Sequence, residues 1–253
     1  MPRKDWTWDE MLLAFNLYCR LPFGKLDQRT QEVRELAGLI GRTPSSVAMK
    51  LGNIARLDPT LQKRGIKGLS RGGKMEKEVW DYFETDWEEL IPESQRLLEE
   101  YQRENEPNEN KAREKAPSHY GATKERKVST RVGQNFFRQA VLAAYGERCC
   151  ITGLDDPNLL IASHIVPWKD DEAQRMNPRN GLCLNALHDK AFDRGLLRIS
   201  REYRVELAPA LKERKQPAYE DFFHRYDGAS IRLPERFPPD PELLSSREGV
   251  DQG

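Results

Sequence analysis

The sequence predicts an α+β fold that is mainly helical, with a helical, helix-turn-helix-like domain at the N-terminus and a unit of two strands and a helix in the C-terminal half. Three observations support this prediction. Apolar residues recur at helical spacing in the N-terminal part of the 253-residue chain. A highly charged stretch with few bulky apolar residues follows. After it, short apolar runs flanked by turn-forming residues precede another segment with helical spacing.

The N-terminal domain contains three segments with the apolar spacing of amphipathic helices. Their apolar stripes are Trp8, Leu12, Phe15 and Cys19; Val33, Leu36, Ala37 and Ile40; and Val47, Leu51 and Ile54. Gly41 suits the end of the second helix, while Thr43 and Pro44 suit the N-cap and first turn of the third. Two helices joined by Gly41 and Arg42 make a helix-turn-helix candidate.

The third helix is expected to carry polar side chains opposite its apolar stripe. In a helix-turn-helix, the second helix of the pair enters the major groove of DNA. The side chains that could reach phosphates or base edges are Arg42, Ser46, Lys50, Asn53 and Arg56, together with Arg131 at the start of the second domain. An ordinary three-helix bundle also has a solvated polar face, so the spacing leaves both interpretations open.

Composition divides the chain into a helical domain over residues 1–100, a charged linker over 101–130 and a second domain over 131–253. In the first domain, the stretch from Val79 to Trp87 predicts a helix that returns its aromatics to the core, and Pro92 to Tyr101 a shorter one. The basic, glycine-rich segment 61–73 predicts a loop. It could follow a phosphate backbone or serve only as a connector.

The second domain is expected to begin with a helix over residues 132–145. Ile151 and the run 159–161 predict two short strands around a turn at residues 153–157. The segment GLCLNALHDKAFDRG has the spacing of a helix that ends at Gly195. Further elements are expected downstream: a hairpin over 196–207, a helix over 219–226 and an irregular arm after Pro234.

The overall charge neither supports nor excludes a nucleic-acid partner, because 41 basic residues balance 41 acidic ones. No apolar run is long enough to cross a bilayer, and MPRKDWTWDE lacks the apolar core of a signal peptide, so we expect a cytoplasmic protein without a membrane partner. The cysteines lack the paired C-x-x-C spacing of a structural zinc site. Buried free thiols are therefore expected at Cys19, Cys149, Cys150 and Cys183.

Three side chains around the predicted strand and helix could serve phosphodiester hydrolysis: His164, Asn180 and His188. That reaction needs a base to activate water, a cation to neutralise developing charge and a group to orient the base. A histidine can be the base because its pKa lies near neutrality. The asparagine could orient it, and the second histidine could bind a divalent ion. The spacing alone also allows all three to be structural.

The motifs SHIVPW and NPRNGLCLNALHDKAFDRGL closely resemble the HNH, or ββα-metal, endonuclease family, in particular its bacterial restriction-type branch. The resemblance is strong from Arg131 to Gly195 and weaker in PFGK and LIGRTPSSVAMKL near the N-terminus. The arrangement is similar to modification-dependent enzymes of the McrA and BisI kind, which act on DNA that carries methylated cytosine.

This resemblance implies a metal-dependent restriction endonuclease that hydrolyses double-stranded DNA with Mg²⁺ or Mn²⁺, in a bacterial or phage-encoded protein. By position, His164 matches the general base, Asn180 the central asparagine, and His188 and Asp193 metal ligands on the helix. Ser163 departs from the family pattern, in which an aspartate or histidine at this position binds the metal. Because one such centre cuts one strand, double-strand cleavage implies a homodimer on DNA or two successive nicks.

Two other classes of protein remain compatible with the sequence. One is a DNA-binding or regulatory protein whose HNH fold has lost its activity, an alternative that Ser163 supports. The other is an RNase or a nuclease without sequence preference. Neither the recognition sequence nor a requirement for methylated cytosine follows from periodicity, because base readout depends on side-chain geometry and DNA shape.

Overall fold

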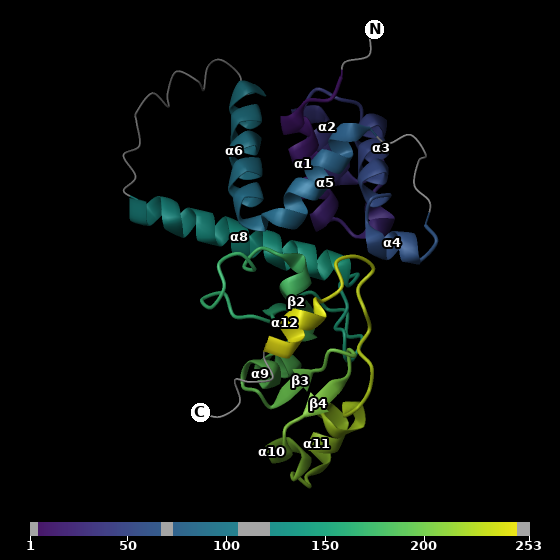
Figure 1. Ribbon diagram of the computed structural model, residues 1–253, viewed down its shortest axis with the longest axis vertical. Coiled ribbons are helices and arrows are strands. Elements are labelled where there is room, and N and C mark those ends of the chain that lie inside the picture. Colours follow the sequence, from purple (N-terminus) through teal and green to yellow (C-terminus); the bar gives the residue numbers. More distant parts are fainter. Residues whose placement is uncertain (1–4, 67–72, 106–121, 247–253) are drawn as a thin grey trace. The chain divides into compact units, whose positions relative to one another are not determined.

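The computed structural model describes residues 5–66, 73–105 and 122–246, with the side chains of 122–129 left out. The chain divides into two compact units, Met1–Phe136 and Phe137–Gly253. Helices dominate, and the strands of the described residues all lie in the second unit (Figure 1). No helix in this described part combines the length and the apolar character that crossing a membrane requires.

The first unit contains the three helices that the periodicity predicts, α1 (Trp8–Arg20), α2 (Gln31–Leu39) and α3 (Pro44–Ala55). A short 3₁₀ turn and three more helices complete it: η1 (Phe23–Lys25), α4 (Pro59–Lys63), α5 (Lys74–Thr85) and α6 (Trp87–Asn105). Helix α1 is buried along most of its length, and Phe15 stacks on Phe83 of α5 with ring centroids 4.1 Å apart. The unit is therefore organised around α1.

The predicted caps are confirmed at the junction of α2 and α3. The Thr43 hydroxyl accepts a hydrogen bond from the Ser46 amide at 3.2 Å, and Pro44 occupies the first turn. Gly41 has a φ of 66°, a left-handed conformation that costs glycine little.

Helix α6 is much longer than the short helix predicted from Pro92 onward, because it starts at Trp87 and continues through the proline. The Asp86 side chain accepts hydrogen bonds from the Glu88 and Glu89 amides, both at 3.0 Å, which stabilises the start of the helix before the proline. The predicted loop 61–73 begins inside α4, and its residues 67–72 lie outside the described part. The expected linker 101–130 holds the end of α6 and the start of α8 (Ala122–Ala144), while residues 106–121 lie outside the described part.

The second unit is built on a two-stranded antiparallel sheet of β1 (Leu160–His164) and β2 (Gly181–Asn185), followed directly by α9 (Ala186–Asp193). A separate hairpin joins β3 (Leu197–Ile199) to β4 (Val205–Leu207), as predicted. The remaining elements are η2 (Pro178–Asn180), α10 (Pro209–Lys212), α11 (Pro217–Phe222), η3 (His224–Tyr226) and α12 (Pro241–Ser246).

The predicted pairing of two strands around residues 153–157 is wrong. Ile151 lies in a turn, and the partner of β1 is the segment 181–185, which the periodicity assigned to a helix. Four of the five residues of β2 are buried, so the strand lacks the alternation that reveals a half-exposed strand. Its hydrogen bonds to β1 connect residues separated by a long loop, which local spacing does not encode.

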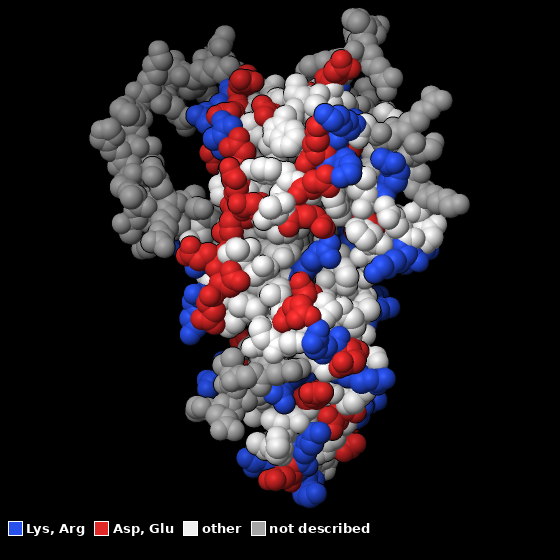
Figure 2. Space-filling model, viewed as in Figure 1, with Lys and Arg blue, Asp and Glu red and all other residues white. Residues whose placement is uncertain are grey.

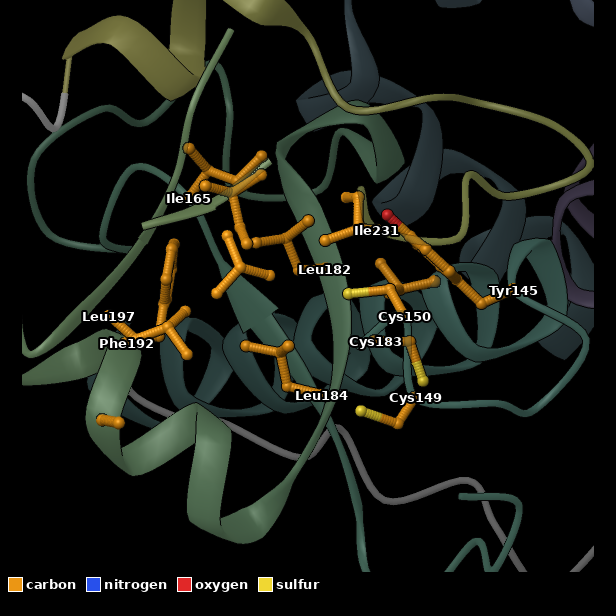
Figure 3. Packing of buried hydrophobic residues seen from close by; sticks show 14 of the residues in the cluster. Tyr145, Cys149, Cys150, Ile165, Leu182, Cys183, Leu184, Phe192, Leu197 and Ile231 are labelled. Carbon is orange, nitrogen blue, oxygen red and sulfur yellow. The ribbon is translucent and has the colours of Figure 1, made fainter. Parts of the chain in front are cut away.

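The core of the second unit packs both strands against the end of α8 and against α9 (Figure 3). Cys149, Cys150 and Cys183 are buried free thiols within this cluster, and Cys19 is one in the first unit. Gly181 lies directly opposite His164 in the sheet register. A Cβ atom there would lie 2.3 Å from the Val141 side chain and 3.1 Å from the Phe137 ring, so only glycine allows α8 to pack closely behind the end of β1.

Candidate active site

His164 is the last residue of β1, and its ring is held between two aromatic side chains. It stacks on Phe137 with centroids 3.7 Å apart and planes at 11°, and it meets Trp168 edge-on at 5.6 Å. Its Nε2 lies 3.0 Å from the backbone oxygen of Arg175. Because a carbonyl oxygen only accepts, Nε2 carries the proton, and Nδ1 is the basic nitrogen of the neutral ring.

Burial lowers the pKa of His164 below its ordinary value. The Arg175 carbonyl and the Asp193 carboxylate act in the opposite direction but do not outweigh burial. The ring is therefore neutral at neutral pH. This is the protonation state in which a histidine can accept a proton from water.

Asn180 is buried and fixes the loop that follows β1. Its side-chain oxygen accepts a hydrogen bond from the Val166 amide at 2.7 Å, and its Nδ2 donates to the carbonyl oxygens of Val166 at 3.1 Å and Gln174 at 3.0 Å. Its own carbonyl accepts from the Ile165 amide at 2.9 Å. Asn180 thus holds both ends of the loop whose Arg175 carbonyl orients His164.

Arg175 and Trp168 brace this same loop, and the sequence analysis did not identify either of them. The Arg175 Nε donates to the Trp168 carbonyl at 2.7 Å, and its guanidinium lies over the Trp168 ring, 5.6 Å from the centroid. Glu172 adds an ion pair to Arg175 at 2.9 Å. The tryptophan of SHIVPW was the available signal, because a large aromatic close to a candidate histidine base can limit the motion of its ring.

His188 is buried on the inner side of α9, where both ring nitrogens have partners. Nδ1 lies 3.2 Å from the Asn185 side-chain nitrogen and accepts from it, while Nε2 donates to the Phe222 carbonyl at 2.7 Å. The ring also meets Phe223 and Tyr226 edge-on, both at 5.6 Å. Coordination of an ion would require one of these hydrogen bonds to break, and the role of His188 as a metal ligand stays a prediction.

Cys149 lies in the same network as His188. Burial acts to raise the pKa of this thiol, but hydrogen bonding with His188 and Thr152 outweighs burial and brings the pKa to about 7. The amides of Thr152 and Asn185 also point at its sulfur, at 3.5 and 3.4 Å. The network ties α9 to the turn that precedes β1 and to the segment after α11.

Asp193 is exposed at the end of α9, close enough to His164 to influence its pKa. Asp189 lies one helical turn earlier, on the same face of α9. The sequence analysis missed Asp189, although its spacing from Asp193 was a usable signal. Ser163, next to His164, is 3% exposed, and its hydroxyl is a buried polar atom without a hydrogen-bond partner in the described structure.

Mg²⁺ binds through one or two carboxylates plus substrate phosphates and keeps several of its waters. Asp189 and Asp193, two carboxylates on one face of α9, could meet that demand. Among the described residues no group of three His, Cys, Asp or Glu side chains could hold an ion alone, so the phosphate would have to complete the set.

The proposed DNA-contacting side chains of the first unit are mostly engaged within it. Arg42 forms an ion pair with buried Glu10 at 2.6 Å, and Lys50 forms one with buried Glu76 at 2.6 Å. Asn53 is also buried and donates to Glu76 at 3.2 Å. Ser46 and Arg56 are half-buried and Arg131 is exposed.

Acidic side chains gather over α6 on the face of the first unit seen in Figure 2. Glu93 and Glu100 of α6 each pair with Arg96 at 2.5 Å, so part of the negative charge of this helix is neutralised within it. The remaining negative charge makes this face unfavourable for a phosphate backbone.

Residues 149–200 match the family model described as HNH endonuclease. The matched stretch contains β1, β2, α9 and β3, and with them His164, Asn180, His188 and Asp193. No protein of curated function matches the sequence. The chain thus carries an HNH endonuclease domain at residues 149–200, in its C-terminal half.

Proposed function

We propose that the protein is a metal-dependent endonuclease that hydrolyses phosphodiester bonds in double-stranded DNA. The observation that supports this most strongly is the state of His164, a neutral ring whose Nε2 is fixed by a backbone carbonyl and whose Nδ1 is basic. It lies within the electrostatic reach of Asp193, inside a domain of a nuclease family.

His164 acts as the general base. Its Nδ1 accepts a proton from water, the oxygen of that water forms a bond to phosphorus, and the bond from phosphorus to the 3′ oxygen breaks. The products carry a 5′ phosphate and a 3′ hydroxyl. Stacking on Phe137 and the hydrogen bond to Arg175 keep the ring in one orientation during proton transfer.

Asp189 and Asp193 are the residues that would hold the divalent ion, Mg²⁺ or Mn²⁺. The bound ion supplies positive charge that stabilises the departing 3′ oxygen. His188, which the family resemblance assigned to the metal, instead fixes α9 through Asn185 and Phe222. Asn180 acts on His164 indirectly, by holding the loop that carries the Arg175 carbonyl.

The restriction role and the response to methylated cytosine are proposals that rest on the resemblance of the two motifs. The helix-turn-helix-like arrangement of α2 and α3 supports a DNA-binding role for the first unit. There, Ser46 and Arg56 remain candidates for direct contact, while Arg42, Lys50 and Asn53 act by stabilising the unit. A twofold dimer on DNA would let two such centres cut both strands.

Incubation of the full chain with matched unmethylated and cytosine-methylated supercoiled plasmids, with Mg²⁺, Mn²⁺ or chelator, tests these proposals. We expect nicking or linearisation only with metal, and faster cleavage of the methylated plasmid. Equal cleavage rates on both plasmids would exclude a dependence on methylated cytosine but would leave the proposed nuclease activity standing.

Duplex binding without cleavage under every metal would favour the second candidate, a DNA-binding protein without catalysis. Ser163 supports this second candidate, because it is a neutral side chain at a position where the family pattern has a metal ligand.

A further inference from the structure

The solvent-facing side of α9 carries two cations beside its two carboxylates. Lys190 and Arg194 are four residues apart, so they lie on the same face, and both are exposed. Lys190 directly follows Asp189 and Arg194 directly follows Asp193. The helix thus presents a row of acids next to a row of bases.

Neither cation forms an ion pair within the described residues, whereas three other cations of the same unit do. Arg148 pairs with Asp155 at 3.0 Å, Lys212 pairs with Asp227 at 2.8 Å, and Arg201 pairs with Glu242. Like charges one turn apart also destabilise a helix. An anionic ligand bound between the two side chains would remove the repulsion between them.

Such a ligand fits the neighbouring chemistry. A phosphodiester carries a negative charge, which two neighbouring cationic side chains attract. Lysine supplies a mobile point charge and arginine a planar group that can contact two phosphate oxygens. These contacts hold the backbone in position and do not read bases.

We propose that Lys190 and Arg194 form a phosphate clamp that binds the backbone of duplex DNA on the outer face of α9. The clamp specifies how the substrate of the proposed nuclease is held, and to that extent rests on the proposed function.

The test measures binding rather than cleavage. A fluorescein-labelled duplex is titrated with the full chain carrying His164→Ala, at a series of salt concentrations, with and without Lys190→Gln and Arg194→Gln. The control pair, Arg214→Gln and Lys215→Gln, removes the same charge from exposed residues between α10 and α11. Thermal unfolding of each variant is measured in parallel.

Loss of two phosphate contacts predicts that the slope of log affinity against log salt becomes shallower by about 1.8, at roughly 0.9 per contact. The control pair should leave the slope close to that of the parent. The melting temperature of the Lys190/Arg194 variant should stay the same or rise, because the like-charge pair is gone.

An unchanged slope, or an equal change in the control pair, would overturn the clamp while leaving metal-dependent cleavage by the wild type intact. Absence of duplex binding by the parent would instead reject the clamp together with DNA as the substrate.

Discussion

The ring of His164 lies flat against the ring of Phe137, with centroids 3.7 Å and planes 11° apart. Phe137 belongs to α8 and His164 to the end of β1, so this contact joins the helix to the proposed base. Gly181, on the neighbouring strand, leaves the space that the Phe137 ring and the Val141 side chain occupy. The packing of α8 is therefore part of the geometry that orients His164.

Replacement of Phe137 by leucine should slow cleavage more than it weakens DNA binding. The variant keeps an apolar side chain but loses the stacked pair, whose interaction is worth about 0.5–1.5 kcal/mol beyond burial. Single-turnover nicking and duplex binding measure the two effects. Phe223→Leu, at a buried aromatic that contacts His188 instead, is the matched control. Equal slowing in both variants would show that the effect is a general loss of packing.

The cleavage rate should rise with pH through a pKa below the ordinary histidine value of about 6.5, then reach a plateau near neutrality. Burial lowers the pKa of His164, so its neutral, reactive form persists to lower pH. The same shift predicts that the free energy of unfolding falls as pH drops below the ordinary value, because the unfolded chain binds the proton more readily. A single-turnover pH profile with its midpoint above that value would contradict the assignment.

Asp193→Asn should change the Mg²⁺ dependence of nicking, whereas His188→Asn should change the stability of the protein. Loss of the Asp193 carboxylate should raise the Mg²⁺ concentration for half-maximal nicking by roughly tenfold or more, since even outer-shell partners contribute that much. His188→Asn should leave the Mg²⁺ midpoint unchanged and lower the free energy of unfolding by about 1–3 kcal/mol, through loss of buried hydrogen bonds. A raised Mg²⁺ midpoint without loss of stability would make His188 a ligand after all.

The sequence predicted the parts of the fold that are encoded locally. Helices α1 and α3 and the Thr43 cap follow from apolar spacing and capping residues within a few positions of each other. Strand β2 was missed because its partner is reached only across the loop after β1, and because burial on both faces removes alternation.

The composition of the candidate site was partly visible in the sequence, but its orientation was not. His188 and Asp189 are adjacent in sequence, yet neighbouring positions on a helix point in directions about 100° apart. Helical spacing places Asp189 and Asp193 on one face, but only the structure shows that His188 faces Phe222. Likewise, helical spacing identified Arg42 and Lys50 as polar but did not reveal their buried partners, Glu10 and Glu76, which lie on other helices.

Arg42→Met should destabilise the first unit by about 3–5 kcal/mol, because it leaves Glu10 buried without its partner. Any loss of DNA binding should follow from unfolding, and the double variant Arg42→Met with Glu10→Gln should recover much of the stability. Urea unfolding and duplex binding are measured on the same preparations. Stability restored in the double variant without recovery of binding would show that Arg42 contacts DNA directly.

The most direct test of the central claim is the Mg²⁺-dependent nicking rate of His164→Ala compared with wild type under single-turnover conditions. His224→Ala, at a histidine outside residues 149–200, serves as the control for loss of an imidazole. Loss of a general base predicts a rate reduced by about 10²–10⁴-fold, with duplex binding, melting temperature and the control variant close to wild type. Nicking by His164→Ala at the wild-type rate would contradict the proposal, because water would then be activated without the His164 imidazole.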